Sequence, residues 1–172
     1  MITSDYLRSM ARYNRWQNES LYKAAATLSD EARRKDRGAF FCSIHGTLSH
    51  IYWADRIWLS RFDLCEPPAV PNPQSGEFVE DFEKLCAKRE ELDATLIAFC
   101  DGYEAGPVTG SLEWYSGAIK ADAKAPLSVV FVHLFNHQTH HRGQVHAMLT
   151  AAGASPKDTC LFIMPLELWP KA

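Results

Sequence analysis

The sequence predicts an all-α fold, a four-helix bundle with a long connection before the last helix. Two observations lead to this class: four long stretches repeat apolar residues at helical spacing, and most of the connections between them are short or medium in length. Hydrophobic residues make up 47% of the 172 residues, which is enough to bury a sizeable core. We therefore expect a single domain over residues 1–172.

The first predicted helix begins with Ser4 as its cap and runs to about residue 28. Ser29, followed by two acidic residues, is a fresh cap and predicts a short helical turn before a polar, solvated segment that ends at Gly38. A second long helix is expected from about residue 43 to residue 63, before a proline-rich loop that ends at Gly76.

The third predicted helix covers about residues 77–101. Its apolar stripe comprises Phe78, Phe82, Leu85, Leu92, Leu96 and Phe99. Glycines punctuate the connection over residues 102–124, in which residues 112–115 indicate a small β-hairpin. Pro126 suits the first turn of the fourth helix, which is expected to reach Ala152 with Gly153 at its end. We expect the partly apolar tail after it to pack back on the bundle.

Charge and cysteine usage exclude several classes of protein. The formal net charge of −3 gives no basic excess for binding nucleic acid or an anionic membrane surface. The first residues lack the apolar stretch of a signal peptide, and no run approaches the length of a membrane span. The five cysteines are scattered and form no C-x-x-C pair, so we expect reduced thiols in a cytoplasmic protein.

Histidines concentrate in the fourth predicted helix, which holds five of the seven in the chain. At about 100° per residue, His137 and His141 point toward the apolar side of this helix. His133 and His140 lie at the edge of that side, and His146 faces away. Two imidazoles four residues apart can bind one metal ion, although the same spacing also arises by chance.

The second helix supplies a third histidine, His50, on a face with the small residues Thr47 and Ala54. His45 is the weaker candidate because it lies about 140° away on the same wheel. One inward histidine alone is more often a hydrogen-bonded core residue. Three of them, with no acidic residue in the same stripe, would each need a polar partner, and a shared metal ion explains them better.

These two helices resemble those of the DinB family, the DinB/YfiT-like metalloenzymes. Residues 48–59 read LSHIYWADRIWL, and residues 133–145 read HLFNHQTHHRGQV, which contains the family's H-x-x-x-H-R-G-Q pattern. The resemblance extends over nearly the whole chain. It implies that His50, His137 and His141 bind a divalent metal ion, while His140 and Arg142 flank the site at the surface, at a dimer contact or behind the ligands. We expect Gly143 to permit close helix packing.

A site with three neutral nitrogen ligands leaves a position open, as catalytic sites do. Zn²⁺, Ni²⁺ and Fe²⁺ all accept this ligand set. The family includes S-transferases and isomerases that use low-molecular-weight thiols such as bacillithiol or mycothiol, so the resemblance implies a homodimeric transferase or hydrolase in which a metal-bound thiol or water attacks a small substrate. The alternative is a non-catalytic, metal-stabilised bundle with a structural or interaction role.

Three further sequence features have no firm role. Asp55 could orient a neighbouring group or be a solvated surface residue. Residues 113–115 could cover the pocket, although ordinary hairpin packing is the simpler expectation. Cys160 could approach the site from the tail or be an ordinary buried thiol.

Overall fold

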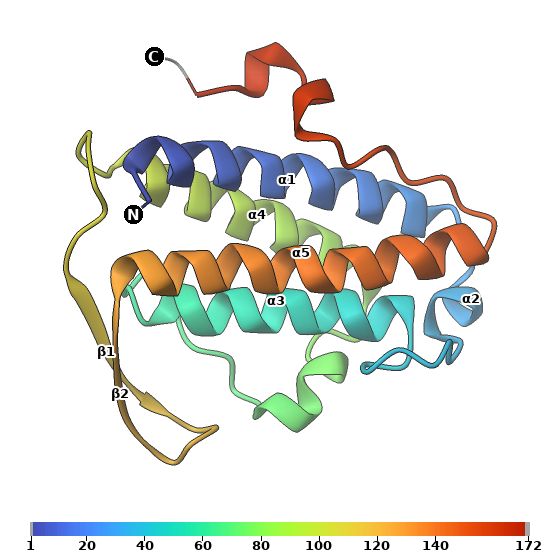
Figure 1. Cartoon of the computed structure of the whole chain (residues 1–172). Coiled ribbons are helices and arrows are strands. Elements are labelled where there is room, and N and C mark those ends of the chain that lie inside the picture. The colour runs from blue at the N-terminus through green and yellow to red at the C-terminus, as the bar shows by residue number, and fades with distance from the viewer. Residues whose placement is uncertain (1, 171–172) are drawn as a thin grey trace.

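Four long helices lie side by side in the computed structural model, which describes residues 2–170 (Figure 1). They are α1 (Ser4–Ala26), α3 (Ile44–Ser60), α4 (Phe82–Asp101) and α5 (Leu127–Ala151). Helix α1 packs against α4 and α5, and α3 packs against the same two helices. All four long stretches predicted from apolar periodicity are therefore helical and enclose a common core.

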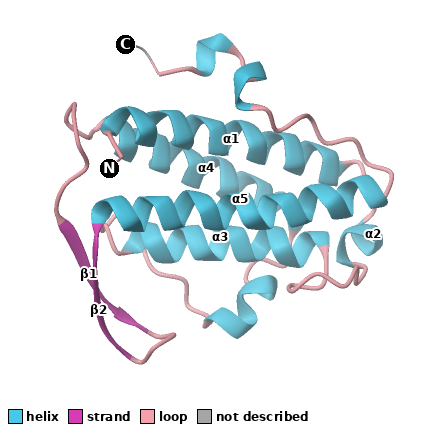
Figure 2. Cartoon of the chain, in the orientation of Figure 1, coloured by secondary structure: helices cyan, strands magenta, loops and turns pink. Residues whose placement is uncertain are grey.

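The remaining elements are short. They comprise α2 (Asp30–Arg34), the 3-10 helices η1 (Asn72–Glu77), η2 (Leu161–Ile163) and η3 (Leu166–Leu168), and the strands β1 (Ser111–Ser116) and β2 (Ala121–Pro126). The two strands pair as an antiparallel hairpin in the connection from α4 to α5, and this hairpin lies at one end of the long helices (Figure 2). The prediction of a hairpin in this connection is confirmed. The description as all-α is too narrow, because the chain is mostly helical with a two-stranded sheet.

Side-chain caps set where the helices begin. The predicted cap Ser29 accepts a hydrogen bond from the backbone N–H of Ala32, and Ser43, where the second helix was expected to begin, accepts one from Gly46. Ser4 does not cap α1, because the Thr3 hydroxyl takes that role one residue earlier.

Helix α4 begins later than the apolar stripe suggested. It starts at Phe82, where the Asp81 carboxylate accepts a hydrogen bond from the Lys84 N–H at 2.8 Å. Residues 72–77, at the boundary where α4 was expected to start, form η1 instead. This separation matters for the site, because η1 packs against α3.

A buried network of charged and polar side chains joins the four long helices. Arg89 on α4 lies 2.6 Å from Asp55 on α3 and 2.8 Å from Asp93, and all three side chains are almost fully buried. On the α1 side, Asn14 donates to Asp93 at 3.1 Å, and Arg142 of α5 donates to the Asn14 side-chain oxygen. Opposite charges from different helices thus neutralise one another, as buried ions require.

This network excludes one of the alternatives left open for each of two residues. Asp55 is not a solvated surface residue, since its side chain is fully enclosed beside Arg89. Arg142 does not flank the histidines at the surface, because it is buried and points toward α1.

The tail crosses the outer face of α1 after leaving α5. The Tyr13 hydroxyl donates to the Thr159 carbonyl at 2.7 Å, and the Lys157 N–H donates to the Ser20 hydroxyl at 2.8 Å. The expected packing of the tail therefore holds near its start, whereas Phe162 and Leu166 further along are largely exposed. No helix among residues 2–170 is both long and apolar enough to cross a membrane.

Candidate metal centre

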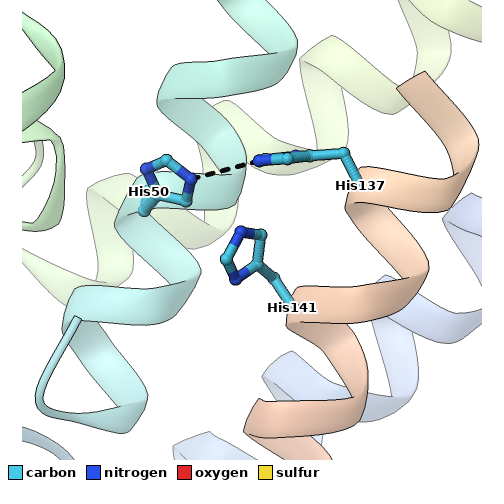
Figure 3. Close-up of side chains that lie close together, drawn as sticks. All are labelled: His50, His137 and His141. Carbon is cyan, nitrogen blue, oxygen red and sulfur yellow. Dashed lines mark hydrogen bonds between the residues drawn. The ribbon is translucent and has the colours of Figure 1, made fainter. Parts of the chain in front are cut away.

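His50, His137 and His141 form one cluster between α3 and α5 (Figure 3). One ring nitrogen from each lies within 4.8 Å of the others, and the Nε2 atoms of His50 and His137 are 3.3 Å apart. Within residues 2–170, no other set of three or more His, Cys, Asp or Glu side chains has this arrangement. The structure thus brings together the three histidines singled out in the sequence, and this cluster could hold a metal ion.

Hydrogen bonds at the outer edges of the rings orient two of these histidines. The Nδ1 atom of His141 lies 2.8 Å from the Gln144 Oε1 atom, which can only accept, so Nδ1 carries the proton and Nε2 keeps its lone pair. The Nδ1 atom of His50 lies 2.8 Å from the Ser75 hydroxyl oxygen. Metal-binding histidines usually donate their second ring N–H to such a partner, so both rings are arranged to offer Nε2.

Ser75 comes from η1, in the proline-rich loop, and is fully buried. The Ser49 hydroxyl on α3 donates to the Ser75 carbonyl at 3.0 Å, which fastens this loop to the helix one residue before His50. Ser75 was not predicted from the sequence, because a single serine in a loop carries no periodicity or motif. Gln144 is the last residue of the H-x-x-x-H-R-G-Q pattern, but only its hydrogen bond with His141, three residues earlier on α5, gives it a role.

Phe41 closes one side of the cluster. Its ring stacks on His50 with centroids 3.7 Å apart and meets His141 edge-on at 5.5 Å. Gly46 in the first turn of α3 makes this possible, since a Cβ atom there would lie 2.4 Å from the Phe41 carbonyl oxygen. The segment before α3 therefore supplies an apolar wall that was not predicted from the sequence.

Burial keeps the three rings neutral. Desolvation, reinforced by the neighbouring imidazoles, lowers the pKa of His50 to about 3 and the pKa of His137 to about 4. The pKa of His141 is also lowered, chiefly by burial. At neutral pH the rings therefore have lone pairs available for a cation.

The arrangement fits a metal ion on its own chemistry. The Nε2 atom of His50 faces that of His137, and two lone pairs at 3.3 Å repel unless a proton or another cation lies between them. The Nδ1 atom of His137 is buried without a hydrogen-bond partner, so nothing fixes which nitrogen of this ring carries the proton. A shared cation satisfies the facing nitrogens of all three rings at once.

The other histidines lie outside the cluster, as the wheel suggested. His45 is buried, and its Nε2 atom lies 2.8 Å from the Val79 carbonyl oxygen. His140 is exposed beside Gln144, and the ring of His146 lies next to the Lys157 carbonyl. His133 packs against Trp58, with ring centroids 5.0 Å apart.

Three other expectations near the site are resolved by the structure. Gly143 does not serve close helix packing, because a Cβ atom there would have nothing within 4 Å. Glu113 forms an exposed pair with Lys124 across the hairpin at 2.5 Å, which is ordinary hairpin packing. Cys160 is exposed and is not part of the metal-competent cluster.

Comparison with known proteins agrees with this picture. The model of the DinB family matches residues 1–164. Protein DinB of Bacillus subtilis (strain 168) is 27% identical over 169 residues, which cover 93% of this chain and 95% of that protein. The crystal structure of a DinB-like protein from Bacillus cereus ATCC 10987 has the same fold, with a TM-score of 0.58 at 19% identity over 83% of this chain and 90% of that one. The chain belongs to the DinB family.

Proposed function

We propose that this protein binds one divalent metal ion through His50, His137 and His141 and uses it to act on a small molecule. The observation that carries the proposal is the set of three neutral imidazoles whose nitrogens converge, two of them oriented from behind by Ser75 and Gln144. The four long helices would then form a single-domain four-helix bundle whose α3 and α5 supply the ligands.

The proposed reaction is transfer of a thiol to a small electrophile, with hydrolysis as the related possibility for a bound water. A metal ion held by three histidines has an open position and lowers the pKa of a thiol or water bound there. The chain's own residues contribute in two ways. Ser75 and Gln144 hold the rings in position, and Phe41 shields one side of the cluster from water.

A second function is favoured by one observation. The cluster joins α3 to α5, and His50 and His141 are only 4% and 7% exposed, so an ion there would also tie the two helices together. In that case the protein would be a metal-stabilised scaffold without chemistry. The two functions differ in whether an outside ligand can reach the ion.

Cobalt spectroscopy of the purified chain separates these functions. We expect the unaltered protein to acquire a visible Co²⁺ spectrum that His137→Ala abolishes, with His146→Ala as the matched control on the same helix. Added azide or a small thiol should change that spectrum if the position is open. A spectrum that no added ligand changes would support the scaffold, and no Co²⁺ uptake would contradict both functions. A thiol-transfer screen that compares the unaltered chain with His50→Ala would then seek the reaction. Light scattering would test the homodimer that the family resemblance implies.

A further inference from the structure

Arg61 is a half-buried cation without an anionic partner. It follows the last turn of α3, and its guanidinium lies 4.1 Å from the ring centroid of Trp58 and 5.0 Å from that of Trp114 on β1. Within residues 2–170 its side chain forms neither a hydrogen bond nor an ion pair, and burial alone lowers its pKa to about 10. By contrast, Arg12 pairs with Asp101 at 2.7 Å.

A row of rings connects Arg61 with the three-histidine cluster. Trp58 contacts His133 at 5.0 Å between centroids, and the His133 ring lies 5.8 Å from that of His137. This row lies where the end of α3, the start of α5 and the hairpin meet (Figure 1). His133 is one helical turn before His137, so the row extends from the cluster by more than about 5.4 Å along α5.

The guanidinium lies between two indole rings that are inclined at 68° to each other, so its flat face can stack on only one of them and some of its donors stay free to bind an anion. Cation–π contacts engage the flat face of the group, whereas its N–H donors point outward in its plane. Those donors match the two oxygens of a carboxylate. The Arg61 nitrogen atoms are in contact with solvent, so a ligand can reach them. The Nε atom of Arg89, by contrast, is buried and has no hydrogen-bond partner.

We propose that Arg61 binds the carboxylate of a small-molecule substrate whose reacting end lies at His50, His137 and His141. This inference rests on the proposed metal-dependent function. The proposed substrate is a small molecule whose carboxylate lies more than about 5.4 Å from the atom that would bind the metal ion. The competing role is purely structural, in which Arg61 only fastens the hairpin to α3 through Trp58 and Trp114.

Two probes of equal length test the inference on the Co²⁺-loaded full chain: 6-mercaptohexanoate and its neutral counterpart 6-mercaptohexan-1-ol. Calorimetric titration should show about tenfold tighter binding of the carboxylate probe, the worth of one charge-assisted hydrogen bond. Arg61→Gln should remove this preference, and Arg61→Lys should retain part of it. Arg15→Gln removes an equal charge from a surface pair with Glu19 and should retain it fully.

Each outcome decides between the roles of Arg61. Equal affinity of the two probes in the unaltered protein overturns the inference, as does a preference that survives Arg61→Gln. A lower unfolding temperature of Arg61→Gln together with an unchanged preference would assign Arg61 to hairpin packing alone. If Arg61→Gln does not fold, the two probes on the unaltered chain and Arg61→Lys still decide. Absence of Co²⁺ uptake would contradict the proposed function itself, whereas normal uptake without a probe preference would contradict only the role of Arg61.

Discussion

Replacing Ser75 with alanine tests whether the loop behind His50 belongs to the metal centre. The substitution removes the hydroxyl that lies 2.8 Å from the Nδ1 atom of His50, inside a region that water does not reach. Loss of such a partner behind a histidine ligand typically weakens metal binding by about 10–100-fold, or about 1.4–2.8 kcal/mol. We expect Ser75→Ala to fall in this range.

The assay is a competition titration of Zn²⁺ or Co²⁺ against a chromophoric chelator. Ser60→Ala is the control serine substitution, because the Ser60 hydroxyl at the end of α3 donates only to the Ile57 carbonyl at 3.0 Å, away from the cluster. We also expect the metal-free Ser75→Ala protein to lose about 1–3 kcal/mol in free energy of unfolding, the cost of leaving a buried donor unsatisfied. A metal affinity equal to that of Ser60→Ala, in a folded protein, would refute the assignment of Ser75.

Three further predictions concern the core, the histidines and two glycines. Asp55→Ala should lower the free energy of unfolding by about 3 kcal/mol in urea titrations because it leaves Arg89 only partly paired, whereas Arg15→Ala at the surface should cost less than about 1 kcal/mol. Since folding lowers the pKa of His50 and His137 to about 3 and 4, the unfolded chain binds more protons below about pH 6.5. The metal-free protein should therefore lose stability as the pH falls from about 6.5 toward 4, and His50→Gln should flatten this dependence; an unchanged slope would contradict the burial of a neutral ring. Gly46→Ala should destabilise the folded protein by about 1–3 kcal/mol, since its Cβ would meet the Phe41 carbonyl, whereas Gly143→Ala should stabilise it by up to about 1 kcal/mol because its Cβ meets nothing. The reverse order of the two variants in thermal unfolding would contradict both local structures.

The helices and the three histidines could be predicted because their signals are local or periodic. A cap such as Ser29 acts within three residues, and apolar stripes reveal which side of a helix is buried. His137 and His141 lie on one helix, so a wheel alone places them together. His50 needed its small-residue face and the family resemblance as well.

The parts that could not be predicted depend on contacts between distant segments. Asp55 was open to a surface role because its partner Arg89 is on another helix, and no pattern along α3 reveals a buried ion pair. Arg142 and Gly143 lie within the recognised motif, yet one is a core residue bonded to α1 and the other is exposed. Ser75 enters the site through a loop whose path follows from tertiary packing rather than local sequence.

Metal analysis of the untagged, purified protein tests the central claim most directly. We predict about one divalent metal ion per chain by inductively coupled plasma mass spectrometry, with His50→Ala, His137→Ala and His141→Ala each losing it and His146→Ala retaining it. The same measurement identifies the ion as zinc, nickel or iron. A chain that takes up no metal even after incubation with these ions, or a His137→Ala variant that retains a full equivalent, would contradict the assignment of the three histidines.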